Sequence, residues 1–167
     1  MMTTEIMIIG CTGKVDSVDD FIKKARKFLA KDDTLLQFMD ADKVLGREHV
    51  FSAWDHAKRA FERESNVSST MAMEVLIYTS GETHIANALK KIGIKDGCER
   101  LAVISDGDLD IDELLGYLNL KRDDEVLICT ESKLREFGIG ENEISAVDKD
   151  KIDDLILEKV AMVDVKK

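Results

Sequence analysis

The stretch MAMEVLIYTSGETHIANALKKIGI, residues 71–94, decides how the middle of this chain folds. Its second part predicts one helix from Ser80 to Ile94, because apolar residues recur there at positions i, i+3, i+4 and i+7. Ser80 or Thr83 can cap the start of this helix, and Gly93 stands where a left-handed residue ends one. The residues that the helix would bury are Ile85, Ala88, Leu89 and Ile92.

The start of this expected helix is small, polar and nearly free of carboxylates, since Glu82 is the single acid between Ser80 and Asn87. A helix N-terminus offers unpaired N–H groups to an anion, and Gly81 lets a phosphate or a base come close. The segment could therefore hold a short single strand of nucleic acid. The side chains that could stack on its bases are those of His56, Tyr78 and His84.

A longer helix is expected before this segment, from Arg47 to Glu62. Val50, Trp54, Ala57 and Phe61 would face inward. The opposite face has a polar, partly cationic stripe, which is either an ordinary solvated face or part of the nucleic-acid site. The stripe consists of His49, Ser52, His56, Arg59 and Arg63, with Lys58 beside it.

The remaining pattern predicts an α+β fold: a single domain over residues 1–167, with a mixed or antiparallel sheet packed against a cluster of helices. The apolar run 70–78 fits a strand or a helix, because it is too short to show a period. The expected strands are 5–11, 34–40, 99–105 and 125–130, and the other expected helices are 17–31, 109–118, 131–137 and 148–162.

Charge separates the middle of the chain from the rest. The 167 residues have a net charge of −10, but residues 43–97 hold eight Lys/Arg and seven Asp/Glu, a net of +1. This balance argues against a non-specific nucleic-acid binder and leaves only the middle able to approach a polyanion. The three widely spaced cysteines, the lack of a long apolar run and the acidic N-terminal stretch predict a cytoplasmic protein without a membrane span.

Three motifs that suggest a cofactor or a metal fail on spacing. The glycines of GCTGK, residues 10–14, are too close together for a phosphate-binding loop. The acidic run 106–113 has Ile111 where a calcium loop needs glycine. His49 and His56 share a helix face, but no third ligand for zinc is evident. We therefore expect no cofactor, no metal and no catalytic residue.

The last expected helix, 148–162, is more apolar than one buried stripe requires, since residues 155–157 are all apolar. Either it is buried on two sides or one side meets a partner protein. Leu157 is the residue best suited to test the second interpretation. The candidate interface residues are Ile152, Leu155, Ile156, Leu157 and Val160.

Four segments, taken in order and spacing, resemble one family. They are DADKVLGREHVFSA (40–53), AMEVLIYTSG (72–81), THIANALKKIGIKDG (83–97) and LEKVAM (157–162). They are similar to the small regulatory subunit of the KEOPS/EKC complex, of the TPRKB type and its archaeal counterparts. The resemblance covers residues 5–165 and is most specific in 40–97.

The resemblance implies a non-catalytic subunit of the complex that makes threonylcarbamoyladenosine in tRNA. Such a subunit docks on a small atypical kinase/ATPase, reaches the other KEOPS subunits through it, and holds the single-stranded CCA end of tRNA. The tRNA-facing residues that it implies are Ser80, Gly81, Thr83, His84 and Asn87, with Lys58 and Arg59 nearby. Two alternatives stay open: a small enzyme with a pocket near His49, His56 and Ser80, and a small-molecule-sensing regulatory domain.

Overall fold

The computed structural model describes residues 5–29, 34–148 and 151–167. Its strands are β1 (Ile6–Thr12), β2 (Leu36–Asp40), β3 (Arg100–Asp106) and β4 (Lys121–Arg122). They form one antiparallel sheet in the order β2-β3-β1-β4. The central pair runs in register from Ile6 opposite Asp106 to Thr12 opposite Arg100.

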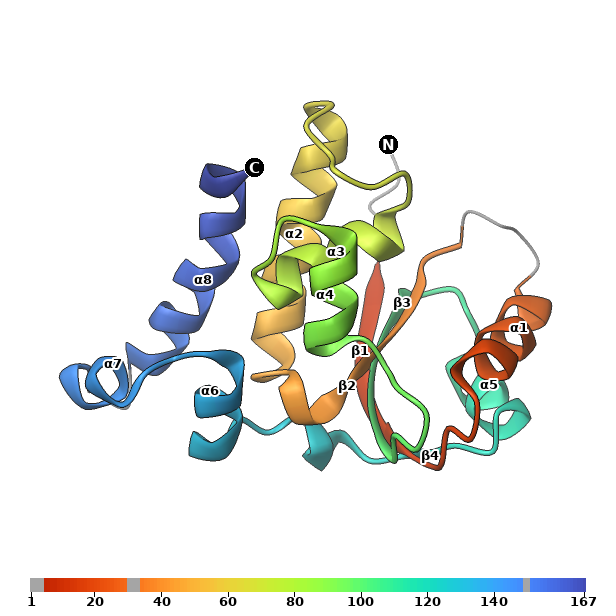
Figure 1. The fold of residues 1–167 in the computed structure, drawn as a ribbon. Helices are drawn as coiled ribbons and strands as arrows, with labels where there is room; N and C mark the ends of the chain where they lie inside the picture. The colour runs from red at the N-terminus through yellow and green to blue at the C-terminus, as the bar shows by residue number, and fades with distance from the viewer. Residues whose placement is uncertain (1–4, 30–33, 149–150) are drawn as a thin grey trace.

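Helices cover both faces of this sheet and extend beyond one side of it (Figure 1). The α-helices are α1 (Val18–Phe28), α2 (Arg47–Glu62), α3 (Met71–Ser80), α4 (Ile85–Ile92), α5 (Ile111–Tyr117), α6 (Glu131–Phe137), α7 (Glu141–Ala146) and α8 (Ile152–Lys166). Two 3₁₀ turns are η1 (Ala41–Lys43) and η2 (Asp124–Leu127). The expected α+β class with an antiparallel sheet packed against helices is confirmed.

Alternate residues of the strands build two separate cores. Ile8 on β1 belongs to a core with α2, α3 and α4, whereas Ile9 belongs to a core with α1 and α5. On β3, Ile104 belongs to the first of these cores and Val103 to the second. This division follows from the pleat, which turns successive side chains to opposite faces. In Figure 1, α1 and α5 lie on one side of the sheet and α2 to α4 on the other.

The ambiguous run 70–78 falls in helix α3, which is buried on every side from Glu74 onward. All seven residues from Glu74 to Ser80 are buried, so no polar face marks a helical period in the sequence. The N-terminal end is capped by Thr70, whose hydroxyl accepts a hydrogen bond from the Met73 N–H. A fully enclosed helix explains why a run without periodicity was compatible with a strand.

The expected single helix from Ser80 to Ile94 is wrong. Ser80 ends α3, and Gly81 follows it in the left-handed region at φ +76°. The Ser-Gly pair therefore acts as a helix end, and α4 starts only after His84. Gly93 has φ −65°, so it is not the left-handed stop that was expected. Ala88 and Ile92 are buried as expected, but Ile85 and Leu89 are exposed.

A third layer lies against α2 on the side away from α1 and α5, and consists of α6, α7 and α8 (Figure 1). Its small core contains Leu45, Leu134, Phe137, Ile139 and Ile156. Helix α8 contacts both α2 and α3. The C-terminal helix is thus an integral part of the packed structure, and it borders the turn between α3 and α4.

Several expected boundaries are corrected. Residues 125–130 are not a strand, because the Asp123 side chain accepts from the Glu125 N–H and caps η2 instead. Helix α7 was not expected, and the last helix starts at Ile152 rather than at residue 148. Residues 149–150 and the end of the expected helix 17–31 lie outside the described residues.

The expected helix 47–62 is confirmed as α2. Its inward face includes Val50 and Ala57 as expected, but Ala53 and Ala60 are buried where Trp54 and Phe61 were expected to be. Trp54 and Phe61 are only partly buried. Of the helices in the described parts of the chain, none is both long and apolar enough to cross a membrane.

Candidate functional site

The turn between α3 and α4 places Ser80 and Gly81 against the third layer. Ser80 is fully buried; its hydroxyl donates to the Ile77 carbonyl at 2.7 Å and accepts from the Glu82 N–H at 3.0 Å. A Cβ on Gly81 would lie 3.9 Å from the Lys159 carbonyl on α8. A side chain here would therefore make only ordinary van der Waals contacts, and glycine is favoured because the backbone has a positive φ. The Ser80 side chain shapes the turn and has no surface to offer a ligand.

Gly81, Thr83, His84 and Asn87 of the expected tRNA-facing residues are at least partly accessible. His84 and Asn87 are exposed and Thr83 is partly exposed; the Thr83 hydroxyl lies 3.2 Å from Nδ1 of His84. No acidic residue occupies the first turn of α4. These residues therefore give α4 a polar N-terminal end on which a base or a phosphate can rest.

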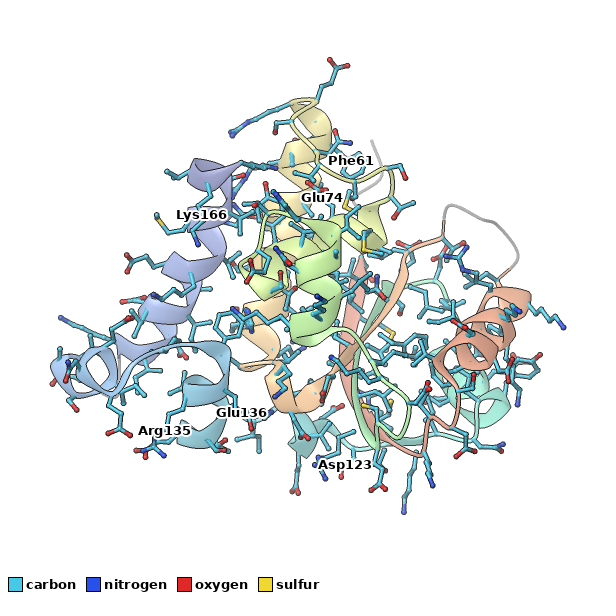
Figure 2. The ribbon with its side chains drawn as sticks, viewed as in Figure 1. Phe61, Glu74, Asp123, Arg135, Glu136 and Lys166 are labelled. Carbon is cyan, nitrogen blue, oxygen red and sulfur yellow. The ribbon has the colours of Figure 1, made fainter. Side chains whose placement is uncertain are left out.

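Three lysines on α4 and α8 were not among the expected site residues: Lys91 in the last turn of α4, and Lys159 and Lys166 on α8. Lys91 on α4 places its ammonium 4.0 Å from the centre of the Phe137 ring. Burial lowers the pKa of Lys91; the charge of Glu82 opposes that shift, and the charges of Lys166 and Lys159 on α8 add to it. The two α8 lysines are thus close enough to Lys91 to act on its charge. Lys166 lies at the C-terminal end of α8 (Figure 2).

Residues of α4 and α8 together make a candidate surface. His84, Asn87 and Lys91 are spaced by three and four residues, so they share a face of α4. We define the α4–α8 basic surface as His84, Asn87, Lys91, Lys159 and Lys166. It has the mixture of cations, a helix N-terminus and a stacking ring that single-stranded nucleic acid requires.

Lys58 is not brought to this surface. Lys58 follows His49 by nine residues, or about two and a half turns, so the two side chains point to opposite sides of α2, and His49 contacts α3. The Lys58 ammonium lies 4.8 Å from the Trp54 ring centre, on the opposite side of α2. Arg59 pairs with Asp55 at 2.9 Å. The expectation that these two cations lie close to the α3–α4 turn is therefore wrong for Lys58.

His56 and Tyr78 are already occupied within the chain. The hydroxyl of the buried Tyr78 donates to Asp164 on α8, and His56 Nδ1 lies 2.7 Å from the other carboxylate oxygen. The two rings stack on each other at 5.5 Å. Burial favours the neutral form of Asp164, but the hydrogen bonds from Tyr78 and His56 outweigh it and lower its pKa. Neither ring is free to stack on a base, so His84 is the remaining candidate.

His49 is a structural residue of the core. Its Nδ1 accepts from the Leu45 N–H at 3.0 Å, and its Nε2 donates to the Thr79 carbonyl at 2.8 Å. Burial lowers the pKa of His49 to about 4, so the ring is neutral at pH 7. A pocket near His49, His56 and Ser80 is not formed, because His49 and Ser80 are enclosed and His56 is paired.

Metal ligation has no support in the described parts of the chain. Within residues 5–29, 34–148 and 151–167, no three His, Cys, Asp or Glu side chains gather closely enough to hold a metal ion. Two shallow clefts are present elsewhere. One is lined by Arg63, Ser65, Val67, Asp164 and Lys167, and the other by Thr12, Gly13, Lys14, Glu99, Arg100, Asp123 and Val126.

The outer face of α8 mixes apolar side chains with the exposed acids Asp154 and Glu158, and two residues of the expected interface are not on it. Ile156 and Val160 are buried in the cores, which corrects the expectation that they meet a partner. Ile152 and Leu155 pack against the third-layer core, and Leu157 is partly exposed.

Four residues form what we call the α8 apolar stripe. Leu157, Ala161 and Val165 are spaced by four residues, and Met162 lies beside them. Met162 is 37% exposed and Val165 is 74% exposed. Val165 was missed because the helix was expected to end at residue 162. An apolar stripe on the surface of a packed helix is typical of a protein-binding face.

The family comparison agrees with the resemblance seen in the sequence. The family described as kinase binding protein CGI-121 matches residues 16–164. The chain belongs to the CGI-121 family. The regulatory protein Cgi121 of Methanocaldococcus jannaschii is 31% identical in an alignment of 140 residues that covers 78% of this chain and 84% of that relative. The TPRKB-type resemblance is therefore confirmed as a family relationship.

In this CGI-121 family chain, α8 takes part in both candidate surfaces. One side of the helix has the α8 apolar stripe, and another gives Lys159 and Lys166 to the α4–α8 basic surface. Its third side is the buried seam formed by Ile156, Val160 and Val163. The two candidate binding surfaces are thus neighbours on a single element.

Proposed function

We propose that this CGI-121 family protein is a cytoplasmic, non-catalytic regulatory subunit that binds a protein kinase through the α8 apolar stripe. The family is described as kinase binding, and the M. jannaschii relative is named a regulatory protein. Leu157 and Val165 provide the accessible apolar area that a helix-mediated contact requires. The partner is the small atypical kinase/ATPase of a KEOPS-type complex, and other subunits are reached through it.

The second part of the proposal is that the α4–α8 basic surface holds the single-stranded CCA end of tRNA. His84 is exposed and able to stack on a base, and Asn87 can bond to a base edge. Lys91, Lys159 and Lys166 give the positive charge that neutralises phosphates. Thr83 and the Gly81 backbone complete the site, whereas Ser80 acts only by shaping the turn. The modification served is threonylcarbamoyladenosine formation.

The observation that carries the proposal is the exposed stripe on a helix of a kinase-binding family, so the first experiment addresses it. Leu157→Glu and Val165→Glu place a charge in the stripe, and each should abolish co-purification with the kinase while circular dichroism stays unchanged. Ile128→Glu is the matched control, because Ile128 is 61% exposed and lies outside α8. Full kinase binding by both α8 variants would contradict the proposed interface.

The tRNA role has its own test. Intact tRNA and the same tRNA trimmed of its CCA end are compared by fluorescence anisotropy at low salt, where phosphate contacts are strongest. We expect the trimmed tRNA to bind more weakly, because a single-stranded end supplies the bases that stack. Equal affinities for the two RNAs would remove the CCA end from the proposal and leave kinase binding untouched.

A further inference from the structure

Helix α7 is a short acidic segment held mainly by ion pairs. All six of its residues, Glu141 to Ala146, are exposed or only partly buried. Glu141 accepts from Nε of Arg135 on α6 at 2.7 Å, and Glu143 lies 3.2 Å from the ammonium of Lys159 on α8. Ile144 makes a partial contact with the third-layer core. Two surface charge pairs and the partial contact of Ile144 therefore hold α7 in place.

These pairs are weak enough to be exchanged for others. The Lys159 and Glu143 side chains are 36% and 43% exposed, so water and salt screen their attraction. Residues 138–148 contain three acids and no Lys or Arg. This segment therefore repels a polyanion as a whole, and Arg135 is the cation at its α6 end (Figure 2).

Lys159 also belongs to the α4–α8 basic surface. It is one of the two α8 lysines whose charges act on Lys91, and its backbone carbonyl borders the α3–α4 turn. An ammonium held by a carboxylate is not free to neutralise a phosphate in the same position. The two roles of Lys159 exclude each other.

We propose that α7 is an autoinhibitory segment: Glu143 occupies Lys159 in the free protein, and a single-stranded RNA end displaces it. This inference rests on the proposed RNA role of the α4–α8 basic surface. An RNA strand presents several phosphates to Lys91, Lys159 and Lys166 together, whereas Glu143 offers a single carboxylate to one of them. RNA therefore wins the exchange, but with reduced affinity, and short anions without this multiple contact are excluded.

The test compares two variants that change the net charge equally. Glu143→Gln frees Lys159, whereas Glu158→Gln removes an exposed acid of α8 that forms no ion pair within the described parts of the chain. The probe is a fluorescent RNA hairpin with a single-stranded 3′ ACCA end, measured by anisotropy between about 50 and 200 mM salt, where phosphate contacts change most. Both variants keep the side-chain volume of the wild type.

Relief of inhibition gives a specific pattern of affinities. We expect Glu143→Gln to bind about two- to fivefold more tightly at low salt, the range open to one exposed ion pair, with Glu158→Gln close to wild type. Salt weakens the internal pair as well as the RNA contact, so the freed variant should also show the steeper salt dependence. In a Lys159→Gln background, Glu143→Gln should have no effect, because its action passes through Lys159.

The outcomes separate this inference from the proposed function. If the wild type binds RNA, and Glu143→Gln and Glu158→Gln bind it with equal affinities, the autoinhibitory role of α7 is overturned while the tRNA role stands. If Glu143→Gln also raises the RNA affinity in the Lys159→Gln background, the exchange mechanism is overturned. Absence of RNA binding by all the proteins would overturn the tRNA role, and with it the role of α7.

Discussion

Tyr78 on α3 and Asp164 on α8, 86 residues apart in the sequence, share a hydrogen bond in which the tyrosine hydroxyl donates to the carboxylate. The same carboxylate binds His56 of α2 at 2.7 Å. One acidic side chain thus joins three helices at the C-terminal end of the molecule. Because Tyr78 is fully buried, its hydroxyl needs this partner.

Tyr78→Phe keeps the ring and removes this hydrogen bond. We expect the free energy of unfolding to fall by about 1–2 kcal/mol, since the acceptor is charged. Urea denaturation measures the change. Tyr117→Phe on α5 is the matched control, because Tyr117 is 42% exposed and its loss of a hydroxyl should change stability by less than about 0.5 kcal/mol. Equal effects of the two substitutions would show that Asp164 does not hold α8.

His49 predicts a specific loss of stability in mild acid. Its pKa is about 4 in the folded state against 6.5 for an ordinary histidine, so below pH 6.5 the unfolded chain binds a proton that the folded chain does not. The stability that the neutral His49 ring contributes to the folded state is therefore complete above pH 6.5 and is lost between pH 6.5 and 4. The loss amounts to about 3 kcal/mol for a fully buried ring.

The measurement is a comparison of unfolding free energies between about pH 7 and about pH 4.5, which spans this titration. His49→Gln removes the titrating ring, so its stability deficit relative to wild type should shrink as the pH falls. His84→Gln removes an exposed histidine and should keep the wild-type pH dependence. A deficit for His49→Gln that stays constant with pH would mean that the ring is not held neutral by burial.

Glu74 is a fully buried carboxylate that organises the loop between α2 and α3. It accepts hydrogen bonds from the N–H groups of Val67 and Ser68 and from the Ser68 hydroxyl, and Lys167 lies 3.5 Å away. Glu74→Gln should destabilise the protein by about 2–3 kcal/mol, because charge-assisted bonds are lost. Amide exchange in the loop should rise. Glu62→Gln, at an exposed site, should leave both measurements unchanged.

Lys91 and Lys58 separate the structure-based RNA surface from the one expected from the sequence. Lys91→Gln should weaken binding of the ACCA-ended RNA and reduce the slope of log affinity against log salt by about 0.7, the value for one contact to a single strand. Lys58→Gln should change neither, because Lys58 lies on the opposite side of α2 from His49. The reverse result would return the RNA site to α2.

The sequence predicted the elements that have one clear periodicity. Helix 47–62 was correct in both ends, because its buried face is narrow and regular. The prediction for the α3–α4 region was wrong because a Ser-Gly pair fits a helix end as well as a helix start. In addition, α3 has no exposed face that would make its helical periodicity visible in the sequence. Periodicity is visible only when one side of an element meets water.

The candidate site was less predictable, because it is assembled from distant segments. Thr83, His84 and Asn87, which were expected to face tRNA, are accessible, and their contact with tRNA stays a prediction. Lys159 and Lys166 lie in an acidic part of the sequence, so the local charge balance gave no sign of them. Only the packing of α8 lets their charges act on Lys91. The polar stripe on α2 suggested an open face, whereas its histidines are used for internal contacts with Thr79 and Asp164.

The last helix presents three groups of side chains in different directions. Its buried seam, its apolar stripe and its lysines share the circumference with exposed acids such as Glu158, so its rotational phase is fixed by all three groups at once. Inserting one residue after Asp154 would rotate everything downstream by about 100° and deliver each side chain to the wrong neighbour. Substitutions along α8 can be absorbed one position at a time, but length changes cannot, and natural variation in this helix should avoid insertions and deletions.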